Sequence, residues 1–588
     1  MKLFTLALDY DGTIARDDRL DPSVREAIAD ARTRGVAVLI VTGRILAELR
    51  RVVGELHFVD GVIAENGAVL HFPESGHTSV LAPPVPRSFV DELSRRGIPF
   101  RAGETLVDAA AEDAPRILEV IRALELPLVL IFNKTRVMVL PQGVSKGTGL
   151  QQALGTLRLS ARNTLAIGDA ENDHELLRLA EVGVAVPWGS ASLREAADHT
   201  LTGGDPTAVA AYIRELGRTG DLPAELQHRR QLLLGRLDDG SPFKLASRGR
   251  NVLVAGDTKS GKSWVTGLLC EQLILHGYCV CVLDPEGDYR AFEALPGVTV
   301  AGGDDPPPSA RDVTRILRYP DRSLVIDLSR LGQDAKVLYI RSMLPVLNTL
   351  RRRTGLPHRI VVDEAHHFLH DPDGASLLDL ERNGYTVATY WASRLPHALL
   401  DATEVMIVTC ESNSAEIDAL RRCCETRTSC GTQDWEGLSR LRPGQAAALP
   451  ITAEAGGRLQ RFNVAGRLTL HVRHRQKYID VPVSEEQAFV FTSAQRARTL
   501  RRFVEHLEQM SADTLEPFIQ RGDFSRWIKD VFGDHALAVD LKAIESRHRG
   551  RRDAATGAAL VDAIRARYDL REDALAAMLA GPGRMRRR

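Results

Sequence analysis

The chain has 588 residues and a mass of 64.6 kDa, which at about 150 residues per domain predicts three to four domains. Apolar residues make up 44% and charged residues 26%, a globular balance that excludes wholesale disorder, collagen and a disulfide scaffold. The 76 Lys and Arg residues and 77 Asp and Glu residues give a net charge of −1, which excludes a globally basic nucleic-acid-binding protein but leaves room for a local basic patch.

The sequence has no pattern typical of secretion or membrane insertion. No apolar run approaches the roughly 18 residues that a membrane span needs, and the N-terminus does not have the composition of a signal peptide. Several of the seven cysteines lie within apolar runs, as Cys279 and Cys281 do, which predicts reduced, buried thiols. We therefore expect a cytoplasmic protein with no membrane partner.

From residue 1 to about 218, short apolar runs alternate with helical patterns. The predicted strands include Leu3–Leu8, Val36–Val41, Gly61–Ala64 and Thr164–Ile167, and the predicted helices include Asp21–Arg34, Gly147–Leu157 and Asn172–Ala180. This alternation predicts an α/β domain with a doubly wound parallel sheet. A proline-rich break at Pro83–Pro86 opens a different stretch, about 83–143, which we interpret as an inserted α/β cap.

A second α/β pattern follows a polar stretch. Residues 219–247 are predicted to be a linker with a helix near Ala224–Leu234. Residues 248–450 are predicted to form an α/β domain with strands at Asn251–Ala255, Cys279–Leu283, Ser323–Asp327, Arg359–Val362 and Val405–Thr409. Residues 451–588 are predicted to be a small, mostly helical module with strands within Leu468–Val483 and a helix over Ala494–Met510.

Two acids follow the first predicted strand directly, in Asp9-Tyr10-Asp11-Gly-Thr. The carboxyl end of a strand is where ligands bind in doubly wound folds. An aspartate there can attack phosphorus as a nucleophile, and a second acid can protonate the leaving oxygen and then activate water. Two carboxylates this close need a cation, which Mg²⁺ supplies.

Further residues suited to phosphoryl chemistry follow in order along the chain. Thr42 ends the second strand with a hydroxyl group and is followed by a glycine amide. Lys146 precedes a predicted helix and can neutralise phosphoryl charge. Asp169 and Asp173, in Gly-Asp-Ala-Glu-Asn-Asp, follow another strand and add acids for a metal.

Together these four ordered motifs resemble the haloacid dehalogenase superfamily, in its Cof-like branch with an α/β cap, over about residues 1–218. The resemblance implies a phosphatase of phosphomonoesters with Asp9 as nucleophile, Asp11 as acid and base, and Thr42 and Lys146 on the phosphoryl group. The Mg²⁺ site that it implies consists of Asp9, the Tyr10 carbonyl, Asp11, Asp169 and Asp173. Glu65-Asn66-Gly-Ala also resembles a turn of this branch. Acids that only cap strands, or a site that binds without turnover, are the alternatives.

The second α/β region opens with a phosphate-binding loop between a predicted strand and a predicted helix at Trp264–Leu275. Lys262 is expected to reach the β- and γ-phosphates of ATP, and Ser263 to ligate its Mg²⁺. Asp363 and Glu364 end a later strand and suit a second Mg²⁺ position and the base that polarises water. The residues expected to bind ATP are Gly256, Thr258, Lys259, Ser260, Gly261, Lys262 and Ser263.

With Asp284-Pro-Glu-Gly-Asp-Tyr, Asp363-Glu-Ala-His-His and Ser393-Arg394, the region 248–450 resembles the HerA/FtsK group of DNA-translocating ATPases. The resemblance implies ATP hydrolysis between the subunits of a homo-oligomeric ring, with a hexamer expected. Arg394 and Arg421 are candidates for a finger across the subunit interface, although a solvated arginine is the alternative. Members carry a Thr-Gln sensor pair where this chain has Thr389-Tyr390.

Our interpretation is a bifunctional enzyme that joins a Mg²⁺-dependent phosphatase to an ATP-hydrolysing ring ATPase. The fusion favours a nucleic-acid context, with DNA as a candidate partner. One alternative is a metabolic phosphatase of sugar or organic phosphates with a regulatory or assembly ATPase domain. Another is a nucleotide-switched scaffold of a defence system.

Overall fold

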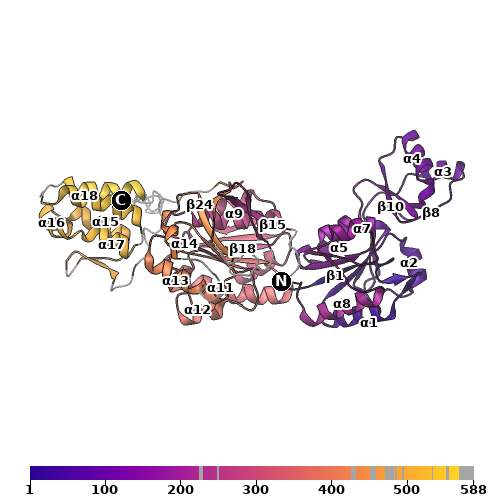
Figure 1. Cartoon of the computed structure of the whole chain (residues 1–588), viewed down its shortest axis with the longest axis horizontal. Helices are drawn as coiled ribbons and strands as arrows, with labels where there is room; N and C mark the ends of the chain where they lie inside the picture. Colours follow the sequence, from indigo (N-terminus) through magenta and orange to yellow (C-terminus); the bar gives the residue numbers. More distant parts are fainter. Residues whose placement is uncertain are drawn as a thin grey trace, which may run out of the picture.

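Three parts lie in a row along the molecule, with the N-terminal part at one end and a helical part at the other (Figure 1). The predicted fold class is confirmed: two α/β regions, the first with an inserted cap, precede a mostly helical C-terminal part. The computed structural model describes residues 1–223, 230–247, 250–424, 432–450, 459–470, 483, 487–492, 495–532, 534–550 and 555–568. No helix in these ranges is long and apolar enough to cross a membrane.

The first region is built on an eight-stranded sheet in the order β14-β13-β12-β1-β4-β5-β6-β7. The strands from β14 to β5 pair in parallel, and β6 and β7 add an antiparallel edge. Its strands are β1 (Thr5–Asp9), β4 (Ala37–Val41), β5 (Gly61–Ala64), β6 (Val69–Phe72), β7 (His77–Val80), β12 (Thr164–Gly168), β13 (Val182–Ala185) and β14 (His199–Thr200). Every residue of β1 is buried, as expected for a parallel strand covered on both faces.

Helices cover this sheet, and their chain order matches the predicted alternation. The main ones are α1 (Pro22–Thr33), α2 (Leu46–Val53), α5 (Lys146–Leu157), α6 (His174–Leu179), α7 (Ala191–Ala196) and α8 (Pro206–Thr219). Asp21 caps α1 by accepting the amide of Ser23 at 2.8 Å, with a proline in the first turn. Ser145 and Thr148 form a reciprocal capping box at the start of α5, which fixes the position of Lys146.

The inserted cap has a four-stranded antiparallel sheet in the order β10-β11-β9-β8, and it stands above the first sheet (Figure 1). Its elements are α3 (Arg87–Arg95), β8 (Phe100–Ala102), β9 (Val107–Ala110), α4 (Ala114–Ala123), β10 (Leu128–Asn133) and β11 (Arg136–Pro141). Phe89 and Leu93 of α3 pack with Ile117 and Val120 of α4 against Val139. The spacing of these apolar residues gives each helix one buried stripe, and the cap has a core of its own.

The second region has an eleven-stranded sheet in the order β16-β15-β25-β24-β23-β17-β22-β21-β18-β20-β19. Its parallel strands are β17 (Val252–Ala255), β18 (Val280–Asp284), β19 (Val298–Gly302), β20 (Ser323–Asp327), β21 (Arg359–Val362), β22 (Tyr385–Thr389) and β23 (Val405–Val408). Its helices include α9 (Lys262–Leu275), α10 (Ala310–Leu317), α11 (Gln333–Thr354), α12 (His397–Asp401), α13 (Ser414–Cys424) and α14 (Thr432–Glu436). The parallel order places β17, which leads into the phosphate-binding loop, between β22 and β23.

Antiparallel strands extend one edge of this sheet, and two of them come from the stretch predicted to be a linker. They are β15 (Gln231–Leu237), β16 (Pro242–Ala246), β24 (Gln445–Pro450) and β25 (Gln460–Val464). The helix predicted near Ala224–Leu234 is wrong from Gln231 on, and residues 224–229 lie outside the described residues. Leu232 and Leu234 are buried while Gln231 and Leu233 face outward, which is the period of two of a strand.

The described residues of the C-terminal part form five helices that pack around aromatic side chains. They are α15 (Leu500–Gln509), α16 (Ala512–Arg521), α17 (Asp523–Asp530), α18 (His535–His548) and α19 (Ala555–Arg567), beside the short strands β26 (Phe489–Val490) and β27 (Arg496–Ala497). Phe503 stacks on Trp527 with ring centroids 4.7 Å apart, and Phe489 lies against both. The predicted helix over Ala494–Met510 begins at Leu500, after the Thr499 cap. Most of the predicted strands within Leu468–Val483 lie outside the described residues.

The two α/β regions meet through buried polar side chains. The Tyr278 hydroxyl group donates to Glu181 Oε1 at 2.9 Å, and Arg162 Nη1 donates to Glu181 Oε2 at 3.2 Å. Tyr278 comes just before β18, and Arg162 just before β12. The amino ends of strands from both sheets therefore meet here, and the carboxyl ends, where the candidate sites lie, point away from the interface.

His358 gives this interface a pH dependence. The amide of Cys279 donates to His358 Nδ1 at 2.8 Å, so the proton is on Nε2, which donates to Asn163 Oδ1 at 2.9 Å. Burial, and then the charges of Arg162 and Arg351, lower the pKa of His358 to about 3. The unfolded chain, with a histidine pKa near 6.5, binds this proton more readily, so stability is lost as the pH falls from about 6.5 towards 3.

We expect His358→Gln to flatten the pH dependence of thermal unfolding between pH 7.5 and 4.5, because glutamine can keep both hydrogen bonds without titrating. The share removed should reach about 2.7 kcal/mol at pH 4.5, two pH units below the histidine pKa of the unfolded chain. His57, an exposed histidine beside Glu55, provides the matched control His57→Gln, which should leave the slope as it is. Equal slopes in His358→Gln and the unsubstituted protein would show that His358 does not titrate at this interface.

Candidate active sites

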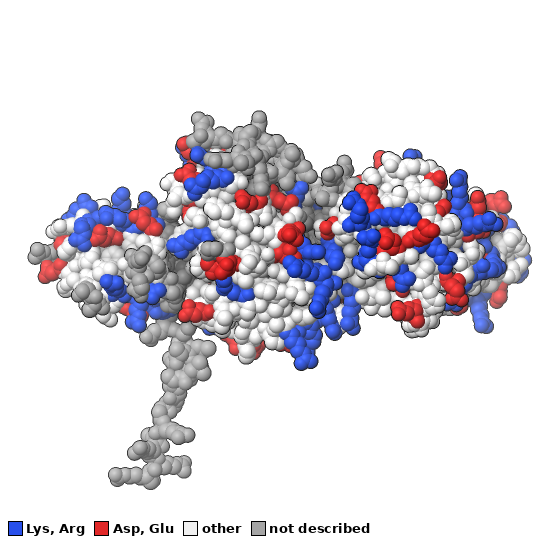
Figure 2. Space-filling model, turned by 90° about the horizontal axis from the view of Figure 1, so that it is seen from below, with Lys and Arg blue, Asp and Glu red and all other residues white. Residues whose placement is uncertain are grey.

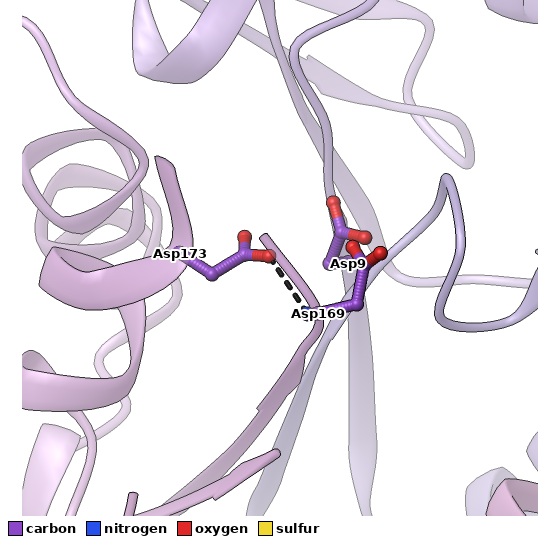
Figure 3. Close-up of side chains that lie close together, drawn as sticks. All are labelled: Asp9, Asp169 and Asp173. Carbon is purple, nitrogen blue, oxygen red and sulfur yellow. Dashed lines mark hydrogen bonds between the residues drawn. The ribbon is translucent and has the colours of Figure 1, made fainter. Parts of the chain in front are cut away.

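Three aspartates meet at the carboxyl end of the first sheet (Figure 3). Asp9 is the last residue of β1, Asp169 follows β12, and Asp173 ends the short helix η4 (Glu171–Asp173). One oxygen of each lies within 4.8 Å of the others, and all three side chains are buried. Asp173 Oδ2 accepts the amides of Asp169 and Ala170 at 3.0 Å each, which fixes the loop after β12.

Lys146 neutralises part of this charge from the first turn of α5. Its ammonium group donates to Asp9 Oδ1 at 2.5 Å and to Asp173 Oδ1 at 2.6 Å, and the side chain is 1% exposed. Burial alone would lower the pKa of Lys146, but Asp173 and Asp9 outweigh it and raise the pKa. Burial and then Asp173 raise the pKa of Asp9 well above its usual range, against the charge of Lys146. Lys146 alone therefore does not neutralise the three acids.

Asp11 and Thr42 flank the triad. Arg44, two residues after Thr42, donates to both carboxylate oxygens of Asp11, from Nε at 2.7 Å and from Nη2 at 2.5 Å. Thr42 is fully buried after β4, and its hydroxyl group accepts the amide of Arg44 at 3.1 Å. The hydrogen bond to Asp11 raises the pKa of Arg44, so the guanidinium group stays charged. Arg44 thus holds Asp11 in one orientation beside the triad.

The Tyr10 carbonyl group, predicted to be a metal ligand, forms hydrogen bonds inside the turn that follows β1. It accepts the amides of Ile14 at 3.2 Å and of Ala15 at 3.0 Å, inside the turn that follows β1. Both hydrogen bonds belong to the turn itself, so a metal ligand at this carbonyl would have to compete with them. The Tyr10 carbonyl stays a predicted ligand, beside the carboxylates of Asp9 and Asp169.

The donor set suits Mg²⁺. Asp9 Oδ2 is buried and has no hydrogen-bond partner within the described part of the chain, so an oxygen is available for a cation or for attack on phosphorus. Burial raises the pKa of Asp169, although Lys134 opposes the shift. Hard carboxylate oxygens are the ligands that Mg²⁺ prefers. A divalent cation would reduce the repulsion that remains among the three carboxylates beside Lys146.

We expect Mg²⁺ to raise the thermal midpoint of the nucleotide-free protein, because it binds the folded triad and not the unfolded chain. At 100 times its dissociation constant the gain is about 2.7 kcal/mol. Asp169→Asn should remove most of the shift. Asp363→Asn should keep it, since Asp363 is predicted to serve a nucleotide-bound metal in the other region. A chelator should reverse the shift, and an equal shift in Asp169→Asn would contradict this metal site.

The second candidate site lies at the carboxyl end of β17. Gly256 and Gly261 have φ values of 145° and 110°, conformations that let the loop curl around a phosphate. Lys262 is 4% exposed, and its ammonium group donates to the carbonyls of Gly256 at 3.0 Å and Asp257 at 2.8 Å. Ser260 bonds Thr409 at 2.5 Å between their hydroxyl groups. The predicted set Gly256, Thr258, Lys259, Ser260, Gly261, Lys262 and Ser263 therefore lies in one strand–loop–helix unit.

Asp363 and Glu364 lie at the end of β21, the strand next but one to β17. Asp363 is fully buried, and its Oδ2 accepts the Tyr289 hydroxyl group at 3.1 Å. Glu364 is 1% exposed and has a φ of 49°, a sparsely populated conformation for a residue other than glycine. His366 bonds the hydroxyl group of Thr389 at 3.0 Å. Tyr289 and His366 are polar contacts that motif spacing did not reveal.

The C-terminal part borders this loop. Lys259 Nζ lies 3.5 Å from the centre of the Tyr568 ring and donates to the carbonyl of Arg567 at 2.9 Å. Tyr390, in place of the expected sensor glutamine, packs in the same apolar cluster as the C-terminal helices. Arg394, a candidate finger, stacks on Trp391 with its guanidinium carbon 3.6 Å from the ring centre. The aromatic residues after β22 thus link the loop to the C-terminal part.

Comparison with known proteins decides the family of the first region. The profile of the haloacid dehalogenase-like hydrolases matches residues 6–96 and 103–213. A phosphoglycolate phosphatase of Natronomonas pharaonis is 32% identical over 231 residues, covering 37% of this chain and 97% of the relative. The chain belongs to the haloacid dehalogenase-like hydrolase family. A phosphoglycolate phosphatase of Methanothermobacter thermautotrophicus is 28% identical over 215 residues, covering 36% of this chain and 96% of that protein.

Two further likenesses extend the comparison. The family described as Helicase HerA, central domain, matches residues 234–368, which include the phosphate-binding loop and Asp363-Glu364. The solved structure of a sugar phosphatase of haloacid dehalogenase subclass IIB is 20% identical, covers 36% of this chain and 99% of that chain, and has a TM-score of 0.31. The predicted pairing of a haloacid dehalogenase-like hydrolase with a HerA-like ATPase domain is confirmed.

The hydrolase's cap contacts the site through residues that the sequence analysis did not assign. Glu65, whose turn was noted only as a resemblance, is fully buried and accepts the amides of Glu104 at 3.0 Å and Thr105 at 2.9 Å, and the Thr105 hydroxyl group at 3.0 Å. Lys134, in the turn between β10 and β11, donates to Asp169 Oδ2 at 2.6 Å. No motif marks Lys134, because only the folded cap brings it to the triad.

Proposed function

We propose that the first region is a Mg²⁺-dependent phosphatase of small phosphomonoesters, with Asp9 as the nucleophile. The observation that carries this proposal is the buried Asp9 carboxylate, with Oδ1 bound by Lys146 and Oδ2 without a partner in the described chain. A carboxylate held by one oxygen and open at the other is oriented for attack. Membership of the haloacid dehalogenase-like hydrolases supports the same chemistry.

The reaction has two displacements at phosphorus. Asp9 Oδ2 forms a bond to phosphorus while the bond to the leaving oxygen breaks, and Asp11 gives its proton to that oxygen. Water, deprotonated by Asp11, then attacks the aspartyl phosphate, and the bond between phosphorus and Asp9 breaks to release inorganic phosphate. Lys146 and Thr42 bind phosphoryl oxygens. Mg²⁺, held by Asp9 and Asp169, would offset the charge of the phosphoryl group.

A small substrate is supported by the position of the cap. Glu65 ties the core to the cap loop at Thr105, Arg101 of the cap donates to Glu48 of the core at 3.1 Å, and Lys134 reaches Asp169. A cap that contacts the core at these three places restricts access to the site, which suits a small metabolite better than the end of a polymer. The relatives named phosphoglycolate phosphatases make 2-phosphoglycolate the first substrate to try.

The test compares phosphate release from 2-phosphoglycolate, a hexose phosphate, and duplex DNA phosphorylated at the 5′ or the 3′ end. We expect kcat/KM for the best small ester to exceed that for either DNA end by at least about 100-fold, a difference of some 2.7 kcal/mol. A preference for DNA ends would overturn the small-substrate proposal and support end processing. No Asp9-dependent phosphate release from any of them would overturn the phosphatase itself.

A nucleic-acid context for the ATPase region is a second candidate function, supported by the match to the HerA central domain. Basic and acidic side chains are interspersed over the face in Figure 2, and basic ones gather near the junction of the two α/β regions. ATP turnover with and without duplex DNA tests this candidate. Stimulation by DNA that Lys262→Ala abolishes would support a motor, and no stimulation would favour a regulatory ATPase. Light scattering with and without ATP tests the expected hexamer.

A further inference from the structure

Lys134 brings a cation to the phosphatase site from the cap side. Its ammonium group lies 2.6 Å from Asp169 Oδ2, whereas Lys146 reaches the triad from the core through Asp9 and Asp173. The Lys134 side chain is 56% exposed, so a ligand in solution can reach it. The same ammonium group would lie 2.7 Å from a Cβ atom at Gly12, the residue after Asp11. Lys134 therefore lies over the loop that carries both catalytic acids.

The cap holds Lys134 in this place through its backbone. Asn133 pairs with Arg136, so Lys134 and Thr135 form a two-residue turn between β10 and β11. Lys134 has a φ of 53°, which residues with a Cβ atom rarely adopt. A positive φ is what a tight two-residue hairpin turn needs at this position, so the turn itself fixes where the side chain begins. The strand β10 also lies against η4, which carries Asp173.

The direction of the reaction assigns Lys134 to the leaving group. Asp9 lies at the end of β1, on the floor of the site, and a displacement at phosphorus needs the nucleophile and the leaving oxygen in line on opposite sides. The leaving alcohol therefore points away from β1 and towards the cap. When Asp169 binds a metal, the Lys134 ammonium group must exchange this carboxylate for another anion. The group nearest to the cap is then the leaving alcohol of the substrate.

We propose that Lys134 determines specificity by binding a carboxylate on the leaving alcohol of the substrate. The inference rests on the proposed phosphatase function and names its substrate class: small phosphomonoesters that carry a second anionic group within a few bonds of the ester oxygen. Such a contact is a charge-assisted hydrogen bond, and it is absent for a phosphomonoester whose leaving alcohol carries no charge. Lys134 acts on binding of the leaving group and takes no part in proton transfer.

The experiment compares 2-phosphoglycolate with its neutral carboxamide at saturating Mg²⁺. The variants are Lys134→Met and, as a matched control in the same turn region, Arg136→Met, whose guanidinium group is turned away to Asp108 at 2.5 Å. We expect Lys134→Met to lower kcat/KM for the carboxylate ester by about 10- to 100-fold, mainly through KM, and to change that for the carboxamide by less than about threefold. Arg136→Met should change both by less than about threefold.

A binding measurement separates recognition from turnover. In an Asp9→Asn background, calorimetric titration with 2-phosphoglycolate should show that Lys134→Met weakens binding by about 10- to 100-fold. This is roughly the loss expected for one charge-assisted contact. Thermal midpoints within a few degrees of the parent would show that the variants fold. Lys134→Arg should recover most of the affinity, because arginine also presents a cation to a carboxylate.

The outcomes distinguish this inference from the proposed function. Equal losses for both esters in Lys134→Met would place the lysine on the phosphoryl group and overturn the inference. Unchanged kinetics, or a wild-type enzyme that does not prefer the carboxylate ester, would overturn it as well. In each of these cases Asp9-dependent phosphate release would leave the phosphatase function standing. The phosphatase function itself would be overturned only if no tested substrate, the hexose phosphate and the DNA ends included, gave such release.

Discussion

Replacing Asp9 by asparagine should lower phosphate release by at least about 10³-fold, because the chain then has no nucleophile that can form the aspartyl phosphate. Asparagine has the same shape but no charge. Asp9 is buried, and Asp173 repels its charge, so the free energy of unfolding of the metal-free protein should stay level or rise. Steady-state phosphate release and thermal unfolding, measured on the same preparation, check the two halves of this prediction.

The matched control is Asp17→Asn. Asp17 is an exposed acid in the same loop region, and its φ of 50° suits asparagine as well as aspartate. This variant should keep phosphate release within about twofold, as surface substitutions usually do. Residual activity in Asp9→Asn that falls with Lys262→Ala would come from the ATPase region acting on the substrate. Activity in Asp9→Asn close to that of the parent would contradict the covalent mechanism.

Sequence reasoning reached those parts of the two sites that local chain order determines. Asp9 ends a buried strand, Thr42 and Asp169 each follow one directly, and parallel strands end at one edge of the sheet. Gly256 and Lys262 lie in one strand–loop–helix unit for the same reason. The order of motifs along the chain was therefore enough to predict that these side chains gather, without knowledge of how the sheets pack.

Contacts between segments far apart in the sequence could not be predicted in this way. Lys134 and Asp169 are 35 residues apart, and only the docking of the cap brings them together. His358 and Asn163 are 195 residues apart and meet across two domains. The strand β15 was missed because the polar stretch around it resembles a linker, and only pairing with β16 and β25 makes its alternation informative. Tertiary pairing decides each of these features.

The interface between the α/β regions suggests how far the two activities depend on one another. Arg162 and Tyr278 meet at the amino ends of β12 and β18, whose opposite ends carry Asp169 and Asp284. Each site is thus separated from the interface by the length of one buried strand. Rigid strands can fix the positions of the two sites relative to one another without any exchange of substrate between the sites. Independent loss of each activity is therefore the expected pattern for single substitutions within either site.

Glu364→Gln should lower ATP turnover by about 10²- to 10⁴-fold, because a neutral amide cannot take a proton from the attacking water. Glutamine keeps the size of the buried side chain, so nucleotide binding should change little. Lys262→Ala should lose binding as well, since the ammonium group of Lys262 is predicted to contact the phosphates directly. ATP hydrolysis and the affinity for a non-hydrolysable analogue, measured side by side, separate the two variants. Phosphate release from a small ester should stay at the parental rate in both.

Asp9→Asn is the reciprocal control for the ATPase, because a phosphatase site can itself cleave ATP. Turnover that survives Asp9→Asn and is lost in Glu364→Gln belongs to the phosphate-binding loop. If Asp9→Asn abolished it instead, the loop would be a nucleotide-binding element without hydrolysis. The buried end of β21 holds Glu364 in a left-handed backbone conformation, with a φ of 49°. Glutamine at this position must adopt the same backbone conformation. Glu364→Gln therefore removes the negative charge at the end of β21 and leaves the backbone conformation unchanged.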